Sequence, residues 1–104
     1  MLSFALIEKN YKSEMYSASV PGFENVQAVI RLRKHTFRPE WGWSIVYNWE
    51  YGTNFVTPNL FAEDRLSRKE ARIIAVRLMK NASSDDFDKL ELFHQNDIRK
   101  HEMH

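Results

Sequence analysis

Residues 41–51 hold the clearest alternation of aromatic and polar side chains in the chain. Every second position from Trp43 to Tyr51 is large and apolar, and the positions between them, from Ser44 to Glu50, are smaller or polar. A period of two places the two sets on opposite faces of a β-strand, and aromatic residues favour strands. All three tryptophans lie in this segment. Its aromatic face is therefore either the wall of the core or an exposed docking surface, and the sequence leaves both interpretations open.

Two further segments have strand patterns. In residues 26–33 every second side chain, from Val26 to Leu32, is apolar. The positions between them include Arg31 and Arg33, which predicts a strand with a basic outer face. Residues 54–57 follow a turn candidate and can return as a short strand until Pro58, which cannot donate a hydrogen bond to a neighbouring strand. These segments predict an antiparallel sheet in the first 60 residues.

The first 20 residues fit two patterns. As a helix, large apolar side chains from Phe4 to Met15 would share one face. As a hairpin, residues 4–7 and 15–20 would form two short strands around a polar turn. The β-favouring residues in 15–20 favour the hairpin, and the helix remains the alternative.

Residues 67–81 have the strongest helix pattern. Ser67 can accept a hydrogen bond from the first turn and Glu70 can reach back to Ser67, which makes a capping box. At about 100° per residue, apolar side chains gather on one face. They are Ala71, Ile74, Ala75, Leu78 and Met79.

Ile73 and Val76 fall on the opposite side of this helix, among basic residues. A helix that touches only a sheet does not need apolar residues there. We therefore expect a second contact at these positions. The favoured contact is the last helix, and the alternative is a partner, including a second copy of the chain.

Residues 84–100 predict a second helix, with Ser84 as the cap and several aspartates in the first turn, where acids complement the helix dipole. Residues 101–104 are expected to fray. The fold class is therefore α+β, a small antiparallel sheet of three to five strands packed by two C-terminal helices. We expect one domain over 1–104, with residues 1–60 mainly in the sheet.

The composition excludes several kinds of chemistry. The chain of 104 residues has no cysteine, which rules out disulfides, thiolate nucleophiles and cysteine zinc sites. Hydrophobic residues make up 43% and charged residues 28%, values typical of a soluble domain. Neither a signal peptide nor a membrane span is visible. The expected location is the cytoplasm, with no membrane partner.

Enzymatic and metal chemistry have little support. The sequence shows no nucleophile elbow, phosphate-binding glycine loop or paired-acid motif, so no catalytic residue is assigned. His101 and His104 have a spacing that can chelate a metal on a helix, and His94 lies two turns before His101. A solvated tail explains these histidines better, because a metal site also needs residues that hold its ligands in place. We expect no metal and no other cofactor.

The charge is unevenly distributed along the chain. The net charge is only +1, but residues 31–80 carry ten Lys and Arg against five acids, a local charge of +5. Residues 81–104 carry three Lys and Arg against six acids, a local charge of −3. The basic centre predicts a site for an acidic partner, or else the acidic final segment neutralises it from within.

The basic residues form two clusters, at 31–38 and 65–72, and the second coincides with a helix N-terminus. Arginine and tryptophan are typical of protein-interface hot spots, and they also grip phosphates and stack on bases. The predicted binding residues are Arg31, Arg33, Lys34, Arg38, Trp41, Trp43, Arg65, Arg68, Lys69 and Arg72. A plain solvated face with arginine stems over the sheet explains the same pattern.

We therefore expect a non-enzymatic interaction module, a small regulator or inhibitor. It would dock an aromatic and basic surface on a larger protein that is acidic or handles nucleic acids. Direct nucleic-acid binding through the two basic clusters is the first alternative. It ranks second because dedicated nucleic-acid modules usually have a pI above about 9, whereas this chain has a pI near 8.0. An unrecognised small enzyme is the second alternative.

Overall fold

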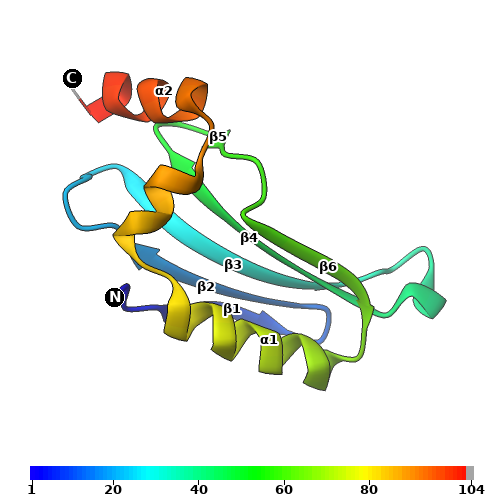
Figure 1. Cartoon of the computed structure of the whole chain (residues 1–104). Coiled ribbons are helices and arrows are strands. Elements are labelled where there is room, and N and C mark those ends of the chain that lie inside the picture. Colours follow the sequence, from blue (N-terminus) through cyan, green and yellow to red (C-terminus); the bar gives the residue numbers. More distant parts are fainter. Residues whose placement is uncertain (103–104) are drawn as a thin grey trace.

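A twisted antiparallel sheet with helices on one face makes up residues 1–102, the part of the chain that the computed structural model describes (Figure 1). The strands are β1 (Ala5–Asn10), β2 (Ser13–Ser19), β3 (Val26–Lys34), β4 (Trp43–Tyr51), β5 (Phe55–Val56) and β6 (Phe61–Leu66). The helical segments are the 3₁₀ turn η1 (Pro39–Trp41), helix α1 (Arg68–Asn81), the 3₁₀ segment η2 (Ser84–Lys89) and helix α2 (Leu92–Glu102). The predicted α+β class is confirmed, and the sheet has six strands rather than three to five.

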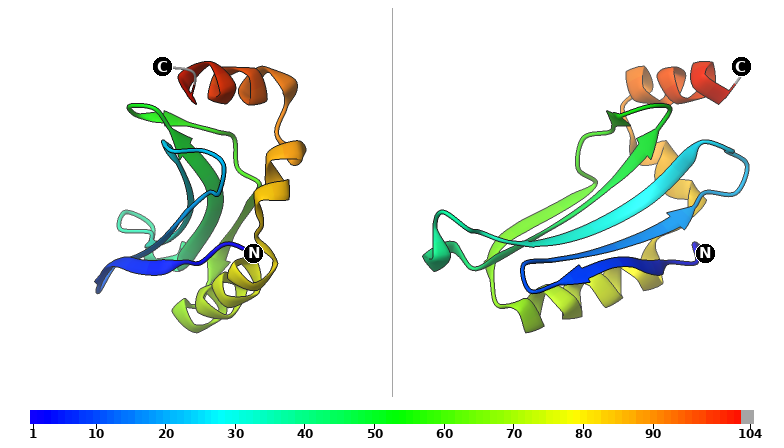
Figure 2. Two further views of the ribbon diagram at one scale, coloured as in Figure 1. Left: turned by 90° about the vertical axis from the view of Figure 1, so that its left-hand side faces the viewer. Right: turned by 180° about the vertical axis from the view of Figure 1, so that it is seen from behind.

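The strands follow the order β1-β2-β3-β4, and the far edge of β4 is shared by β5 and β6. α1, η2 and α2 all lie on one side of this sheet, and its other side carries no helix in the described residues (Figure 2). β3 pairs with β4 along its whole length, from Val26 opposite Tyr51 to Lys34 opposite Trp43. The apolar sets of the two strands therefore share the helix side of the sheet.

The aromatic face of β4 is the core wall, which resolves the alternative left open by the sequence. Trp43, Tyr47, Trp49 and Tyr51 are all buried. Their polar atoms find partners inside: the Trp49 indole donates to the Tyr47 hydroxyl at 3.0 Å, and that hydroxyl donates to Asp86 at 2.7 Å. Burial and the hydrogen bond to Asp86 both raise the pKa of Tyr47.

The N-terminal segment is a hairpin, as favoured from the sequence, with β1 and β2 joined at Tyr11 and Lys12. Asn10 directs this turn, because its side-chain oxygen accepts the backbone N–H of Lys12 at 3.0 Å. β1 forms one edge of the sheet, and all of its residues are exposed.

Helix α1 begins as predicted. The Ser67 hydroxyl accepts the N–H of Glu70 at 3.0 Å, and Glu70 accepts the N–H of Ser67 at 3.0 Å. Ala71 and Ala75 are buried against the sheet, where small side chains allow the helix backbone to approach closely. The predicted apolar face is therefore the packed face.

The helix predicted over 84–100 is instead divided into η2 and α2. Ser83 rather than Ser84 is the cap, and its hydroxyl accepts the N–H of Asp85 at 3.2 Å. The division has a tertiary cause, because Asp86 is held by Tyr47 and Phe87 is buried in the core. The Gln95 side chain donates to the carbonyl of Leu90 at 2.9 Å, and so provides a hydrogen-bond partner for a backbone carbonyl at the break between the two segments.

The cover expected over Ile73 and Val76 from the last helix is not found. α1 runs along the lower side of the sheet in Figure 1 and α2 lies at the top of the view, so α2 does not reach Ile73 and Val76, which are both 46% exposed. The expected frayed tail also differs: His101 and Glu102 belong to α2, where the Glu102 carboxylate accepts the N–H groups of Glu24 and Asn25 at 3.0 and 2.9 Å. Residues 103–104 lie outside the described residues.

Strand β6 was not predicted, because its sequence is rich in charge and shows no alternation. Pairing with β4 forms it, from Phe61 opposite Tyr47 to Leu66 opposite Trp43, with an irregularity near Arg65. Arg65 has a positive φ of 60°, which turns the end of the strand toward the loop between β3 and β4.

Candidate cationic and aromatic binding surface

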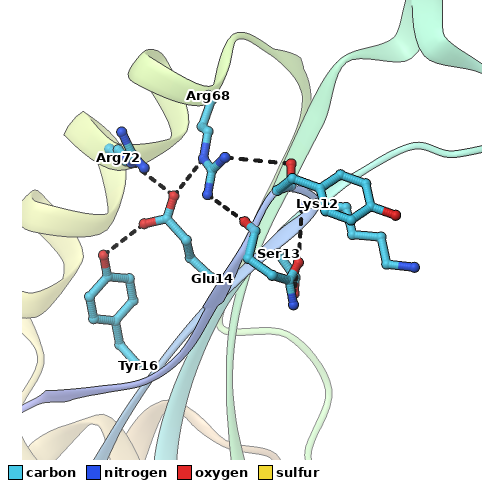
Figure 3. A network of polar contacts seen from close by, with 8 residues as sticks. Lys12, Ser13, Glu14, Tyr16, Arg68 and Arg72 are labelled. Atoms are coloured by element: carbon cyan, nitrogen blue, oxygen red, sulfur yellow. Dashed lines mark hydrogen bonds and ion pairs between the residues drawn. The ribbon is translucent and has the colours of Figure 1, made fainter.

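Two of the predicted binding arginines hold the fold together. Arg68 and Arg72 of α1 converge on Glu14 of β2, each with its Nε at 2.8 Å from Oε2 of the carboxylate (Figure 3). Glu14 is only 1% exposed, and it also accepts the Tyr16 hydroxyl at 3.0 Å. A buried carboxylate with this many donors ties the first turns of α1 to the N-terminal hairpin.

The surroundings of Glu14 favour its ionised form. Burial raises the pKa of this carboxyl, but the hydrogen bonds from Arg68, Arg72 and Tyr16 outweigh burial and leave the pKa below its usual range. Arg68 also donates to the backbone carbonyl of Asn10 at 2.7 Å. The guanidinium groups of Arg68 and Arg72 are therefore used inside the fold, and their acidic partner is Glu14 rather than a residue of the acidic final segment.

Three more of the predicted binding residues do not contribute to a shared exposed surface, because one is buried, one is paired with an acid and one is isolated on α1. Trp43 is 7% exposed, beneath the guanidinium of Arg68, whose carbon lies 4.5 Å from the ring centre. Arg31 pairs with Glu50 at 3.2 Å on the side of the sheet without helices. Lys69 is exposed on α1, but it lines none of the clefts described below.

The remaining predicted residues meet at one end of the molecule, where the loop 35–42 projects beyond the sheet (Figure 1). We call this end the cationic tip. It consists of Arg33, Lys34, His35, Phe37, Arg38, Trp41 and Arg65. Phe37 was missed by sequence reasoning. Its only signal was a large apolar side chain outside any strand or helix pattern.

Trp41 is the centre of the tip. The guanidinium carbons of Arg38 and Arg65 lie 4.9 and 5.2 Å from the centre of its ring system, within range of a cation–π attraction. The ring of His35 packs edge-on at 5.2 Å. Two arginines from different elements are therefore held in place by one indole.

The loop that carries Trp41 is closed by its own backbone. Pro39 is the first residue of the 3₁₀ turn η1. The N–H of Trp41 donates to the carbonyl of Arg38 at 2.9 Å, and the N–H of Gly42 donates to the carbonyl of Pro39 at 3.0 Å. The N–H of His35 then donates to the carbonyl of Gly42 at 2.9 Å.

Gly42 is required at the end of this loop. Its φ is 63°, and a Cβ would collide with the backbone carbonyl of Leu66. This close approach of the loop to the end of β6 is what brings Arg65 beside Trp41.

The tip is open to a ligand. A cleft of about 350 Å³ lies among Arg33, Lys34, His35, Phe37, Arg38 and Trp41. A second cleft of about 330 Å³ shares Arg33 and Lys34 and adds Lys12 and Arg31. Phe37 is 97% exposed.

The four Lys and Arg side chains of the tip are those of Arg33, Lys34, Arg38 and Arg65. None of them forms a salt bridge with any residue in 1–102. The loop also carries one acid, the exposed Glu40. The tip therefore combines an excess of cations with exposed aromatic surface, and this chemistry suits an anionic ligand that also offers apolar contact.

No group of three or more histidine and acidic side chains within 1–102 is arranged to hold a metal ion. None of the helices in the same range is both long and apolar enough to cross a membrane.

No family model matches the chain, and no curated protein or solved structure is significantly similar to it.

Proposed function

We propose that this protein is a non-enzymatic interaction module, a regulator or inhibitor that docks its cationic tip on an acidic surface of a larger partner protein. One observation carries the proposal. The guanidinium groups of Arg38 and Arg65 both lie over the ring of Trp41, beside a Phe37 side chain that is 97% exposed. Arginine and aromatic side chains are the usual anchors of protein interfaces.

The arrangement reduces the cost of binding. Arg38 and Arg65 are already positioned by the indole, so less side-chain freedom is lost when they meet carboxylates. Planar guanidinium groups can bind a carboxylate through two parallel hydrogen bonds, which adds direction to the attraction. Phe37 adds an apolar anchor that can enter a pocket of a folded partner. We place this encounter in the cytoplasm because the chain has no cysteine.

Nucleic-acid binding is the second candidate, and the adjoining cleft is the observation that favours it. Lys12 and Arg31 line this cleft together with Arg33 and Lys34, and its acidic groups are Glu8 in the lining and Glu50 paired with Arg31. Against it, the guanidinium groups of Arg38 and Arg65 occupy positions over the Trp41 ring, where a base would have to stack. The net charge of +1 also gives little long-range attraction for a polyphosphate. The protein partner is therefore the better match.

Photo-crosslinking in the source cell tests the proposal. A photoreactive phenylalanine analogue is placed at Phe37, and in a control at Phe93, which is 71% exposed on α2 at the other end of the sheet. We expect the probe at position 37 to capture one discrete protein with an acidic surface, and the probe at position 93 not to capture it. The crosslinked product should resist nuclease treatment.

Two results would overturn the proposed function. In the first, the product from position 37 is a nucleic acid, or disappears after nuclease treatment, and the second candidate replaces the first. In the second, positions 37 and 93 give the same products, which shows that the tip has no preference over another exposed phenylalanine.

A further inference from the structure

An apolar groove lies between strand β6 and helix α1, apart from the cationic tip. Its volume is about 550 Å³. Its apolar lining consists of Phe61, Leu66, Ile73, Ile74 and Leu78, and four polar or charged residues complete it, Glu63, Glu70, Arg77 and Asn81. Ile73 accounts for part of the apolar surface that the sequence left unexplained, since it is 46% exposed and lines this groove.

The strand beside the groove has a free edge. β6 pairs with β4 on one side, and no other strand within residues 1–102 pairs with it. Residues 62–65 of β6 are exposed. A free edge next to an apolar groove is the arrangement that binds an extended peptide, because the edge offers backbone hydrogen bonds and the groove takes alternate side chains.

The two ends of the groove carry opposite charge. A single residue, Ser67, joins β6 to α1, so Leu66 and the acidic Glu70 lie at the same end, and Glu63 lines the groove from the middle of β6. Phe61, Leu78 and Asn81 meet at the other end, where they also line an adjoining cleft. Arg77 lies one helical turn before Asn81 and faces the groove without a salt bridge to any described residue.

We propose that this groove binds the extended C-terminal end of a partner protein, which adds to β6 as an antiparallel strand. An antiparallel peptide begins beside Leu66 and ends beside Phe61. Its first residue is then basic, beside Glu70, two alternate residues are apolar, and its terminal carboxylate lies beside Arg77 and Asn81. The groove from Glu70 to Asn81 is about 16 Å long at 1.5 Å per helical residue, which fits a strand of about five residues.

Charge also decides against a second copy of the chain as the occupant. If β6 paired with its own copy across a twofold axis, the acidic residues Glu63 and Asp64 of the two copies would face each other at the centre of the pairing. Like charges on directly opposed strand positions are destabilising. A separate peptide with a basic first residue has no such conflict.

The probe is a set of fluorescent pentapeptides Arg-Thr-X-Ser-X, in which each X is Val, Ile, Leu or Phe and the C-terminus is a free carboxylate. Binding to the full chain is measured by fluorescence anisotropy. We expect saturable binding by at least one peptide, and about tenfold weaker binding after amidation of its C-terminus, the loss expected for a charge-assisted hydrogen bond. If no peptide of the set binds, the proposal is wrong.

Ile73 and Val76 provide a matched pair of variants. Both are 46% exposed on α1, but only Ile73 lines the groove. We expect Ile73→Glu to abolish peptide binding and Val76→Glu to leave it unchanged, with the helical circular dichroism of both variants intact. Equal effects of the two variants would overturn the proposal, as would a dimer of the free chain that Ile73→Glu dissociates, because a second copy would then occupy the groove.

Discussion

At the scale of single residues, Glu14 is the most constrained side chain in the structure. It is almost fully buried, yet it is charged, and its partners come from an element more than fifty residues away in the sequence: Arg68 and Arg72 at 2.8 Å each. Burying a carboxylate is costly, and removing it leaves two cations without their partner. This one residue therefore makes the position of α1 depend on the N-terminal hairpin.

We predict that Glu14→Gln lowers the free energy of unfolding by about 2–3 kcal/mol. The value is below the range of about 3–5 kcal/mol for a broken buried pair, because Arg68 and Arg72 reach solvent and can rehydrate. Urea denaturation measures the change. Glu8→Gln on the exposed strand β1 is the control, with an expected effect within about 0.5 kcal/mol.

The pH dependence of stability should report the same carboxylate. The folded-state pKa of Glu14 lies below its unfolded value, so its stabilisation is complete above the ordinary glutamate pKa of about 4.3 and is lost as the pH falls through the lower folded value. We predict that wild type loses more stability than Glu14→Gln between pH 7 and pH 3, measured by urea denaturation. Equal losses would show that Glu14 is not ionised in the fold.

At the scale of elements, the loop 35–42 is as important as any strand, because it assembles the cationic tip from β3, η1 and β6. Gly42 allows the loop to pass close to the carbonyl of Leu66, and Arg65 takes a left-handed φ at the end of β6. The Arg38–Trp41–Arg65 stack depends on both conformations.

We predict that Gly42→Ala destabilises the protein by about 2–3 kcal/mol, since the methyl group adds a collision with Leu66 to the strain of a positive φ. Gly22→Ala is the matched control. It also has a positive φ, of 91°, but nothing lies within 4 Å of its Cβ position. Its expected cost is about 1 kcal/mol. Thermal denaturation compares the two variants, and equal costs would contradict the proposed collision.

The elements that local patterns could predict were those whose own residues specify them. The alternation in β3 and β4 and the capping box of α1 gave the correct structures because burial and capping act on neighbouring residues. β6 and the break between η2 and α2 escaped prediction. β6 forms only because β4 offers an edge, and η2 ends where contacts from Tyr47 and Gln95 require it.

The candidate site was less predictable than the fold, because charge in the sequence does not say which cation is already paired. Arg68 and Arg65 are equivalent in sequence pattern, but the first is bound to Glu14 and the second stacks on Trp41. Phe37 had no pattern at all, since an exposed aromatic in a loop resembles a poorly packed residue until the surrounding cations are located.

At the scale of the whole molecule, charge is separated along the sheet. The tip at one end carries cations without a salt bridge in residues 1–102, whereas three acids of the C-terminal segments are used internally. Asp97 accepts the Tyr51 hydroxyl at 2.6 Å, Asp86 pairs with Lys89 at 2.9 Å, and Glu102 caps the turn at Glu24. Burial and the bond to Asp97 raise the pKa of Tyr51 to about 12. The molecule thus presents one positively charged end to an approaching partner.

The most direct measurement is the dissociation constant of the crosslinked partner for two double variants at physiological salt. We predict that Arg38→Glu with Arg65→Glu weakens binding at least about 100-fold. Lys80→Glu with Lys100→Glu makes the same change in net charge away from the tip, and we predict that it changes binding by less than about threefold. If the two double variants weaken binding equally, net charge rather than the cationic tip determines recognition, and the central claim is wrong.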